Sequence, residues 1–227
     1  MTIRERFRLA FCSNSSLRIS QSSNLVKSMK LCTSFMSSIT NNLLDVRKME
    51  EGKMTLSNNP TNLKTVIKNV QDMLRPSLRK GVEFVCNFPP GTDLWVLADT
   101  HRLQQVYTNV VTNAIKYTVE GKIELVFYFD ETGNGVFECR DTGPGIPLGQ
   151  QQEIFSRFVQ RRGAPGTGLG LAIAKHLVDL AGGSIKFVSD PTTKPGTDCI
   201  VTIPFRKCEP VWFIPLRLIR SQRNYHS

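Results

Sequence analysis

Two asparagines and a lysine recur at helical spacing near the middle of the sequence. Apolar residues between Asp99 and Thr118 repeat every three to four positions, which predicts a helix over that stretch with one apolar side made of Leu103, Val106, Val110 and Ala114. Asn109, Asn113 and Lys116 then fall on one face of the helix. Asparagine is a poor helix former, whereas amide oxygens suit Mg²⁺ and lysines suit phosphate. The pattern indicates a metal–phosphate site, with an ordinary polar face as the alternative.

Two glycine-rich stretches follow this helix. Asp141 ends a predicted strand and precedes Thr-Gly-Pro-Gly, so its carboxylate can accept a hydrogen bond from an exocyclic amine. Gly143 and Gly145 would let the backbone lie against a flat ring, although a simple turn is the alternative. The second stretch, Gly166-Thr-Gly-Leu-Gly-Leu, enters a helix predicted over residues 169–181. Backbone N–H groups at such a helix start favour phosphate, and neither a P-loop nor a dinucleotide motif is present.

The elements that must position these residues can be predicted from periodicity. Strands are predicted at residues 81–88, 123–129, 136–140, 184–189 and 199–204. Helices are predicted at residues 62–80 (shortened by Pro76), 99–118, 152–158 and 169–181. This order predicts an α+β fold: a two-layer α/β sandwich, with helices on one side of a mixed sheet.

A long helix is predicted before this domain. Apolar residues from Leu25 to Val46 alternate steps of four and three, which is typical of a coiled-coil seam, and Gly52 supplies a helix stop. The seam predicts a homodimer or heterodimer through this helix. Packing of the helix on its own domain is the alternative.

Charge and composition exclude several classes of protein. Residues 1–30 carry a net +5 and residues 206–227 a net +4, so only +1 of the total +10 remains between them. A basic surface within the folded part is therefore not expected, which argues against nucleic-acid binding. No apolar stretch is long enough to span a membrane, and the six cysteines lack metal-site spacing. The cytoplasm is the expected location. Mitochondria are the alternative, because the first 30 residues loosely resemble a transit peptide.

Five segments together resemble the nucleotide motifs of the sensor histidine kinases, within the GHKL or Bergerat-fold family. They are Asn109-Val-Val-Thr-Asn113-Ala-Ile-Lys-Tyr117-Thr, Asp141-Thr-Gly-Pro-Gly, Ile154-Phe-Ser-Arg-Phe158, Gly166-Thr-Gly-Leu-Gly-Leu and Gly196-Thr197. Their order matches the N, G1, F and G2 boxes and the last nucleotide box of that family. The resemblance implies a partial dimerisation domain at residues 21–55 and an ATP-binding catalytic domain at 60–205. The composition of the two ends predicts a disordered segment at residues 1–20 and a basic, apolar tail at 206–227.

The resemblance also implies roles for individual residues. Asn113 would bind Mg²⁺, Asn109 and Lys116 would act at the phosphates as catalytic residues, and Asp141 would accept a hydrogen bond from the adenine amine. The implied ATP-binding residues are Asn113, Tyr117, Asp141, Gly143, Gly145, Gly166, Thr167, Gly168, Leu169, Gly170 and Thr197. ATP and Mg²⁺ are therefore the expected cofactors.

The sequence departs from the family in two places. The phosphoacceptor motif around histidine is absent, because the three histidines are His101, His176 and His226. Autophosphorylation at the usual site is not expected. The γ-phosphoryl would pass to a histidine on another chain or a missing segment, from which a response-regulator receiver would take it. The alternative is a nucleotide-binding, dimer-modulating protein without phosphotransfer.

The second departure is in the ATP lid. Seven residues separate Phe158 from Gly166, and Pro165 stands where the family usually has Gly. Proline removes an N–H and stiffens the backbone, whereas Arg161 and Arg162 either compensate with charge or are plainly solvated.

Overall fold

The computed structural model describes residues 29, 33, 36, 37, 39–90, 94–158, 167–192 and 194–210. The chain divides into two compact units, residues 1–48 and 49–227, and each is described by itself. In the first unit, residues 39–48 and the described positions before them are helical. The rest of the predicted seam lies outside the described residues, so the long helix and its pairing stay predictions. Within the described part of the chain, no helix is both long and apolar enough to cross a membrane.

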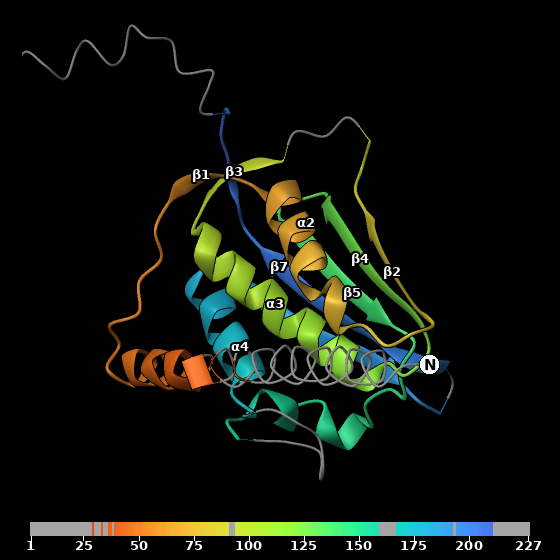
Figure 1. Cartoon of the computed structure of the whole chain (residues 1–227). Coiled ribbons are helices and arrows are strands. Elements are labelled where there is room, and N and C mark those ends of the chain that lie inside the picture. Colours follow the sequence, from red (N-terminus) through yellow and green to blue (C-terminus); the bar gives the residue numbers. More distant parts are fainter. Residues whose placement is uncertain are drawn as a thin grey trace, which may run out of the picture. The chain divides into compact units, whose positions relative to one another are not determined.

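A five-stranded sheet forms the centre of the second unit (Figure 1). Its order is β2 (Val82–Asn87), β4 (Gly121–Phe129), β5 (Gly135–Asp141), β7 (Lys194–Ile203) and β6 (Ser184–Asp190). The β2–β4 pair is parallel, and the other three pairs are antiparallel. The sheet is therefore mixed, as the sequence predicted.

Three helices cover one face of this sheet: α2 (Leu63–Leu74), α3 (Thr100–Tyr117) and α4 (Gly170–Leu180) (Figure 1). The predicted apolar stripes are confirmed, since Leu103, Val106, Val110 and Ala114 of α3 are all buried. Tyr107 of α3 stacks on Phe137 of β5, with ring centroids 4.2 Å apart. The helix-on-sheet arrangement explains the near-complete burial of these residues, because the apolar side of the helix packs against the sheet and is removed from water.

The alternation of the strands places two of the candidate site residues on the helix-covered face. Ile123 of β4 is fully buried under the helices and lies directly opposite Asp141 on β5. Asp141 in turn lies opposite Thr197 on β7. Directly opposed residues share a face of a sheet, so Asp141 and Thr197 both face the helical layer.

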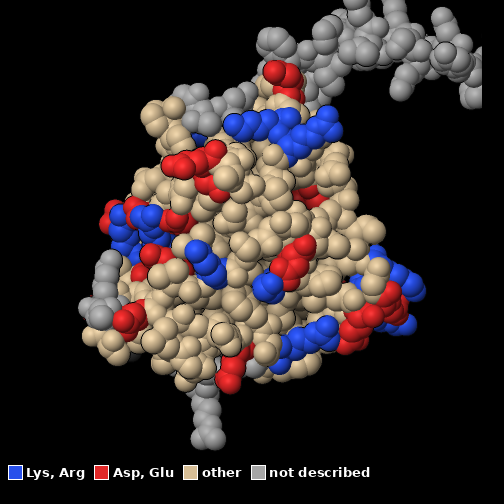
Figure 2. All heavy atoms as spheres, turned by 180° about the vertical axis from the view of Figure 1, so that it is seen from behind, with Lys and Arg blue, Asp and Glu red and all other residues tan. Residues whose placement is uncertain are grey.

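The reverse face of the sheet carries charges of both signs, interspersed (Figure 2). On its surface Lys122 pairs with Glu124 at 2.9 Å, and Arg140 pairs with Glu138. The solvent-accessible Lys122–Glu124 pair contributes little to stability. Glu138 is buried, and Arg140 supplies the opposite charge that its carboxylate needs there.

The structure corrects two details of the predicted elements and confirms a third. A second sheet, of β1 (Asn59–Asn62), β3 (Trp95–Ala98) and β8 (Arg206–Lys207), was not predicted, and β8 lies in the stretch assigned to the tail. The helix predicted at 152–158 is wrong, because this segment has only 3₁₀ turns at Leu148–Gln150 and Glu153–Phe155. The predicted shortening of the 62–80 helix by Pro76 is confirmed, because α2 ends at Leu74 and a 3₁₀ turn follows at Arg75–Ser77.

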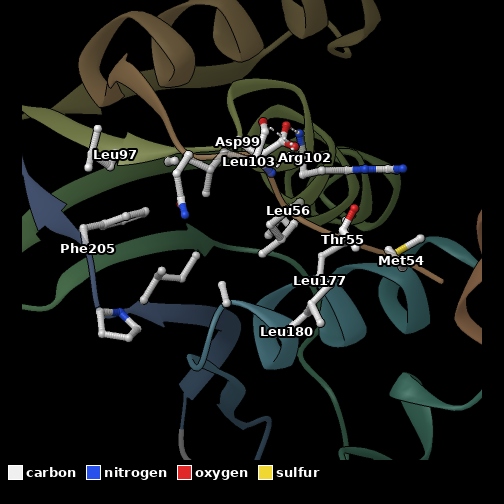
Figure 3. Close-up of a pocket in the computed structure, with 17 residues that line it drawn as sticks. Met54, Thr55, Leu56, Leu97, Asp99, Arg102, Leu103, Leu177, Leu180 and Phe205 are labelled. Atoms are coloured by element: carbon white, nitrogen blue, oxygen red, sulfur yellow. Dashed lines mark hydrogen bonds between the residues drawn. The ribbon is translucent and has the colours of Figure 1, made fainter. Parts of the chain in front are cut away.

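Asp99 joins the start of α3 to the segment before β1. One carboxylate oxygen accepts the N–H of Arg102 at 3.0 Å, which caps the helix. The other accepts the N–H and the hydroxyl of Ser57 at 3.1 and 2.9 Å. Figure 3 shows Asp99 on the wall of a pocket of about 470 Å³, whose apolar lining includes Leu56, Leu103, Leu177 and Phe205.

We expect Asp99→Ala to lower the free energy of unfolding by about 1–2 kcal/mol at neutral pH, because it removes a helix cap and the anchor of Ser57. Burial alone would raise the pKa of Asp99, but hydrogen bonds from Arg102 and Ser57 lower it below the ordinary 3.8. Because the pKa of Asp99 is lower in the folded than in the unfolded protein, its carboxylate stabilises the fold at pH values above the unfolded pKa. This stabilisation is lost as the pH falls through the folded pKa. Urea denaturation should therefore show a smaller difference in the free energy of unfolding between the parent and Asp99→Ala near pH 3 than near pH 7. Asp72→Ala, at an exposed position of α2, is the control and should leave stability nearly unchanged.

Candidate functional site

The polar face of α3 meets the start of α4. Asn109, Asn113 and Lys116 are all half-buried on α3. The side-chain oxygen of Asn109 lies so close to Gly170 that a Cβ there would be 3.1 Å from it. The amide nitrogen of Asn109 is buried and has no hydrogen-bond partner among the described residues. A buried donor without a partner is costly, so this nitrogen is suited to an oxygen that a bound group supplies.

The beginning of α4 is arranged for an anion. Leu169 stands at the N-cap, and no described side chain caps the helix there. Thr167 instead accepts the N–H of Leu169 at 3.3 Å, and Gly168 adopts a left-handed φ of 71°. Among the described residues, no side chain takes the N–H groups of the first turn, which lie at the positive end of the helix dipole and suit an anionic acceptor. Gly166 lies outside the described residues, as do Arg161, Arg162 and Pro165.

A second group of predicted residues gathers where β5 and β7 lie side by side. Asp141 accepts the N–H of Gly143 at 2.8 Å and also the N–H of Thr197. Gly143 has no room for a side chain, since a Cβ would lie 2.8 Å from the Asp141 carboxylate and 3.3 Å from the Tyr117 carbonyl oxygen. Burial raises the pKa of Asp141 to about 6, although these hydrogen bonds oppose the shift.

Two further glycines allow this close approach of backbones. Gly196 has a φ of 116°, and a Cβ there would lie 2.4 Å from the Asp141 carbonyl oxygen. Gly145 has a φ of 76°, and a Cβ there would lie 2.9 Å from the Ser189 hydroxyl. Both positions require glycine for conformation and for space. The turn after β5 is thereby pressed against the start of β7.

Helix α3 connects the two groups. Asn109, near its middle, meets the start of α4, and Tyr117, at its end, meets Gly143. Asn113 lies between them, and the Lys116 ammonium lies 5.1 Å from the Tyr117 ring centroid. Along α3 there thus lie an amide donor and a helix start, neither of which has a side-chain partner in the described part of the chain, and a partly buried carboxylate. Such a set can accommodate a molecule with a phosphate end and a ring that bears an amine.

Sequence reasoning missed two residues in this region. The hydroxyl of Ser189 on β6 binds both the turn after β5 and the start of β7, and the side chain of Gln151 binds the same turn. A serine in a strand and a glutamine in a polar run carry no spacing signal. Only the folded contacts identify them.

Residues 98–207 match the family model for histidine kinase-, DNA gyrase B-, and HSP90-like ATPases. The autoinducer 2 sensor kinase/phosphatase LuxQ of Vibrio harveyi is 33% identical over 184 residues, which cover 76% of this chain and 21% of LuxQ. The chain therefore spans about a fifth of the length of that relative.

Two solved structures share the fold. Full-length ShkA, in complex with AMPPNP, superposes with a TM-score of 0.69 and 28% identity, over 76% of this chain and 36% of that one. A mycobacterial sensor histidine kinase, MprB, superposes with a TM-score of 0.59 and 31% identity, over 66% of this chain and 99% of that one. The box motifs, the fold and these relatives agree: the chain belongs to the sensor histidine kinases and contains their ATP-binding catalytic domain.

Proposed function

We propose that this catalytic domain binds ATP with Mg²⁺ and transfers the γ-phosphoryl group to a histidine other than His101, His176 and His226. The observation that carries the proposal is the Asn109 amide, which has no partner among the described residues, beside the start of α4, which no described side chain caps. Phosphate oxygens would satisfy both the amide and the helix N–H groups. The complex of ShkA with AMPPNP supports a nucleotide in this region.

The residues of this site fit the expected nucleotide and metal. Asn113 would hold Mg²⁺ through its amide oxygen, and Lys116 would neutralise phosphate charge. Asp141 would accept a hydrogen bond from the adenine amine while Gly143 and Gly145 leave room for the ring. When bound, Mg²⁺ neutralises the charge that develops on the β- and γ-phosphate oxygens. Tyr117, Gly166, Thr167, Gly168, Leu169, Gly170 and Thr197 would complete the nucleotide site.

Asn109 favours phosphoryl transfer over hydrolysis. A neutral amide does not accept a proton near pH 7, so it is unsuited to activate water as a carboxylate would. In the proposed transfer, the bond between the γ-phosphorus and the bridging oxygen breaks and ADP leaves. A bond forms between the phosphorus and an imidazole nitrogen, which releases its proton to solvent. The predicted partners are a histidine-bearing kinase chain, paired through the N-terminal helix, and a response-regulator receiver.

The test uses the full chain, radiolabelled ATP with Mg²⁺, and a second chain that carries a dimerisation domain with its phosphoacceptor histidine. We expect acid-labile label on the second chain, lost when that histidine is changed to Gln or when Asn113 here is changed to Ala. Hydrolysis of ATP without the acceptor should stay far slower than transfer. Label that persists on the acceptor chain after its histidine is removed would contradict the proposal.

The alternative function is a nucleotide-binding protein that modulates a dimer without phosphotransfer. The absence of the phosphoacceptor motif from this sequence favours it. The same experiment distinguishes the two: normal ATP binding without label on any histidine-bearing partner would favour the modulator.

A further inference from the structure

Ser189 and Gln151 lie outside every nucleotide motif, yet they hold the turn that carries Gly145. The hydroxyl of Ser189 accepts the N–H of Ile146 at 2.9 Å and donates to the carbonyl oxygen of Gly196 at 2.7 Å. One hydroxyl therefore bridges the turn after β5 and the start of β7. These are the two segments between which Asp141 and Thr197 face each other.

Gln151 closes the same arrangement from another direction. Its amide nitrogen donates to the carbonyl oxygen of Ile146 at 2.9 Å and to that of Ser189 at 2.5 Å. A primary amide has two N–H groups, so both bonds can form at once. Ile146, Ser189 and Gln151 thus form a closed ring of hydrogen bonds. We call these three residues the base clamp.

Because the base clamp is largely buried, water cannot easily take the place of its hydrogen bonds. Ser189 is 8% exposed, and Gln151 and Ile146 are half-buried. The segment of Gln151 is also held by an aromatic contact, because Phe155 lies on Phe187 of β6 with ring centroids 5.2 Å apart. Loss of one clamp side chain would leave backbone donors and acceptors without partners. The turn after β5 would then move so that these groups could form hydrogen bonds with water.

The position of this turn bears on recognition of the base. The Ser189 hydroxyl fills the space that a Cβ on Gly145 would occupy, and it holds Gly196 where it packs on the backbone of Asp141. A shift of the turn would therefore move Gly145 relative to the Asp141 carboxylate. It would leave Asn109 and Asn113, which lie on α3, in place.

We propose that Ser189 and Gln151 are positioning residues that set adenine selectivity, acting through the Gly143–Ile146 turn and touching no phosphate. The inference rests on the proposed ATP site. It predicts that the base clamp governs how well ATP is distinguished from GTP, whereas the residues on α3 govern affinity for either nucleotide. A purely structural role would lower the folded fraction and leave the ATP-to-GTP affinity ratio of the folded protein unchanged.

The experiment is calorimetric titration of the full chain with Mg²⁺ and ATP or GTP. Gln151→Glu keeps the shape of the side chain but removes both N–H donors, and Gln152→Glu repeats the charge change at an exposed neighbour. Ser189→Ala is paired with Ser184→Ala, which lies at an exposed position of the same strand. We expect both clamp variants to bind ATP about tenfold more weakly, with a clearly lower ATP-to-GTP ratio, and both controls to match the parent.

The possible results of this titration separate the base-clamp inference from the proposed function. Clamp variants that bind ATP as the parent does, or that weaken ATP and GTP equally, would overturn the inference. If Ser189→Ala does not fold, Gln151→Glu at its half-buried position still gives the answer. A parent chain that binds neither nucleotide would refute the proposed function itself, and the inference would fall with it. A parent that binds while the clamp variants keep its selectivity would refute the clamp alone.

Discussion

Asn113→Ala is expected to weaken Mg²⁺-dependent ATP binding at least about 100-fold, because it removes the amide oxygen proposed to hold the metal. The loss cannot come from unfolding. Asn113 is half-buried on α3, and alanine is a better helix former, so stability should stay level or rise by about 0.5 kcal/mol. Calorimetry with and without Mg²⁺, next to thermal denaturation, separates the two effects.

The matched control for Asn113 is Gln104→Ala, which removes an amide from the same helix two turns earlier. It should bind ATP as the parent does. Equal binding by Asn113→Ala and the parent would exclude Asn113 as the metal ligand. If Asn113→Ala and Gln104→Ala both lost ATP binding to the same extent, the loss would be due to a disturbed α3 and not to a missing metal ligand.

Asp141→Asn is expected to weaken ATP binding on the order of 100-fold near pH 7.5 while making the protein more stable. An asparagine keeps an oxygen for the Gly143 N–H, but it places N–H donors where the adenine amine needs an acceptor. Stability should rise because burial disfavours the charged carboxylate, which is why its pKa is raised to about 6.

Stability and ATP affinity should change in opposite directions as the pH rises through the pKa of Asp141. A folded pKa of about 6, above the ordinary 3.8, means that the contribution of Asp141 to stability is present below the unfolded value and is lost as the pH rises through about 6. ATP affinity should do the opposite in the parent, rising through about pH 6 as the carboxylate ionises. The D141N variant should show neither change. Asp179→Asn, at an exposed position of α4, should keep both profiles, and a pH-independent affinity in the parent would contradict the assignment.

Much of this arrangement was predictable where a pattern repeats. The apolar stripe of α3 was confirmed residue by residue, because helical periodicity over 18 residues leaves little ambiguity. The order of the boxes predicted the family, and the structure brings Asp141, Gly143 and Tyr117 together as that resemblance implies. The roles of these residues remain predictions until nucleotide binding is measured.

The missed features share one physical cause: they depend on contacts between distant parts of the chain. Strands β1, β3 and β8 have four, four and two residues, too few to show alternation, and they exist because they pair with one another. Gln151 and Ser189 are 38 residues apart, and nothing local joins them. The segment around residues 152–158 has helical composition, yet it is held as 3₁₀ turns by contacts such as that of Phe155 with Phe187.

Helix α3 has a mechanical consequence. It begins at Asp99, which grips Ser57, and ends at Tyr117, which abuts Gly143, so it is a stiff rod about 27 Å long. A tilt of about 5° about the Asp99 end would displace the far end by about 2 Å, several times the range of about 0.5 Å in donor–acceptor distance over which a hydrogen bond forms. The segment before β1 and the base end of the site are therefore mechanically connected, because they contact opposite ends of one helix.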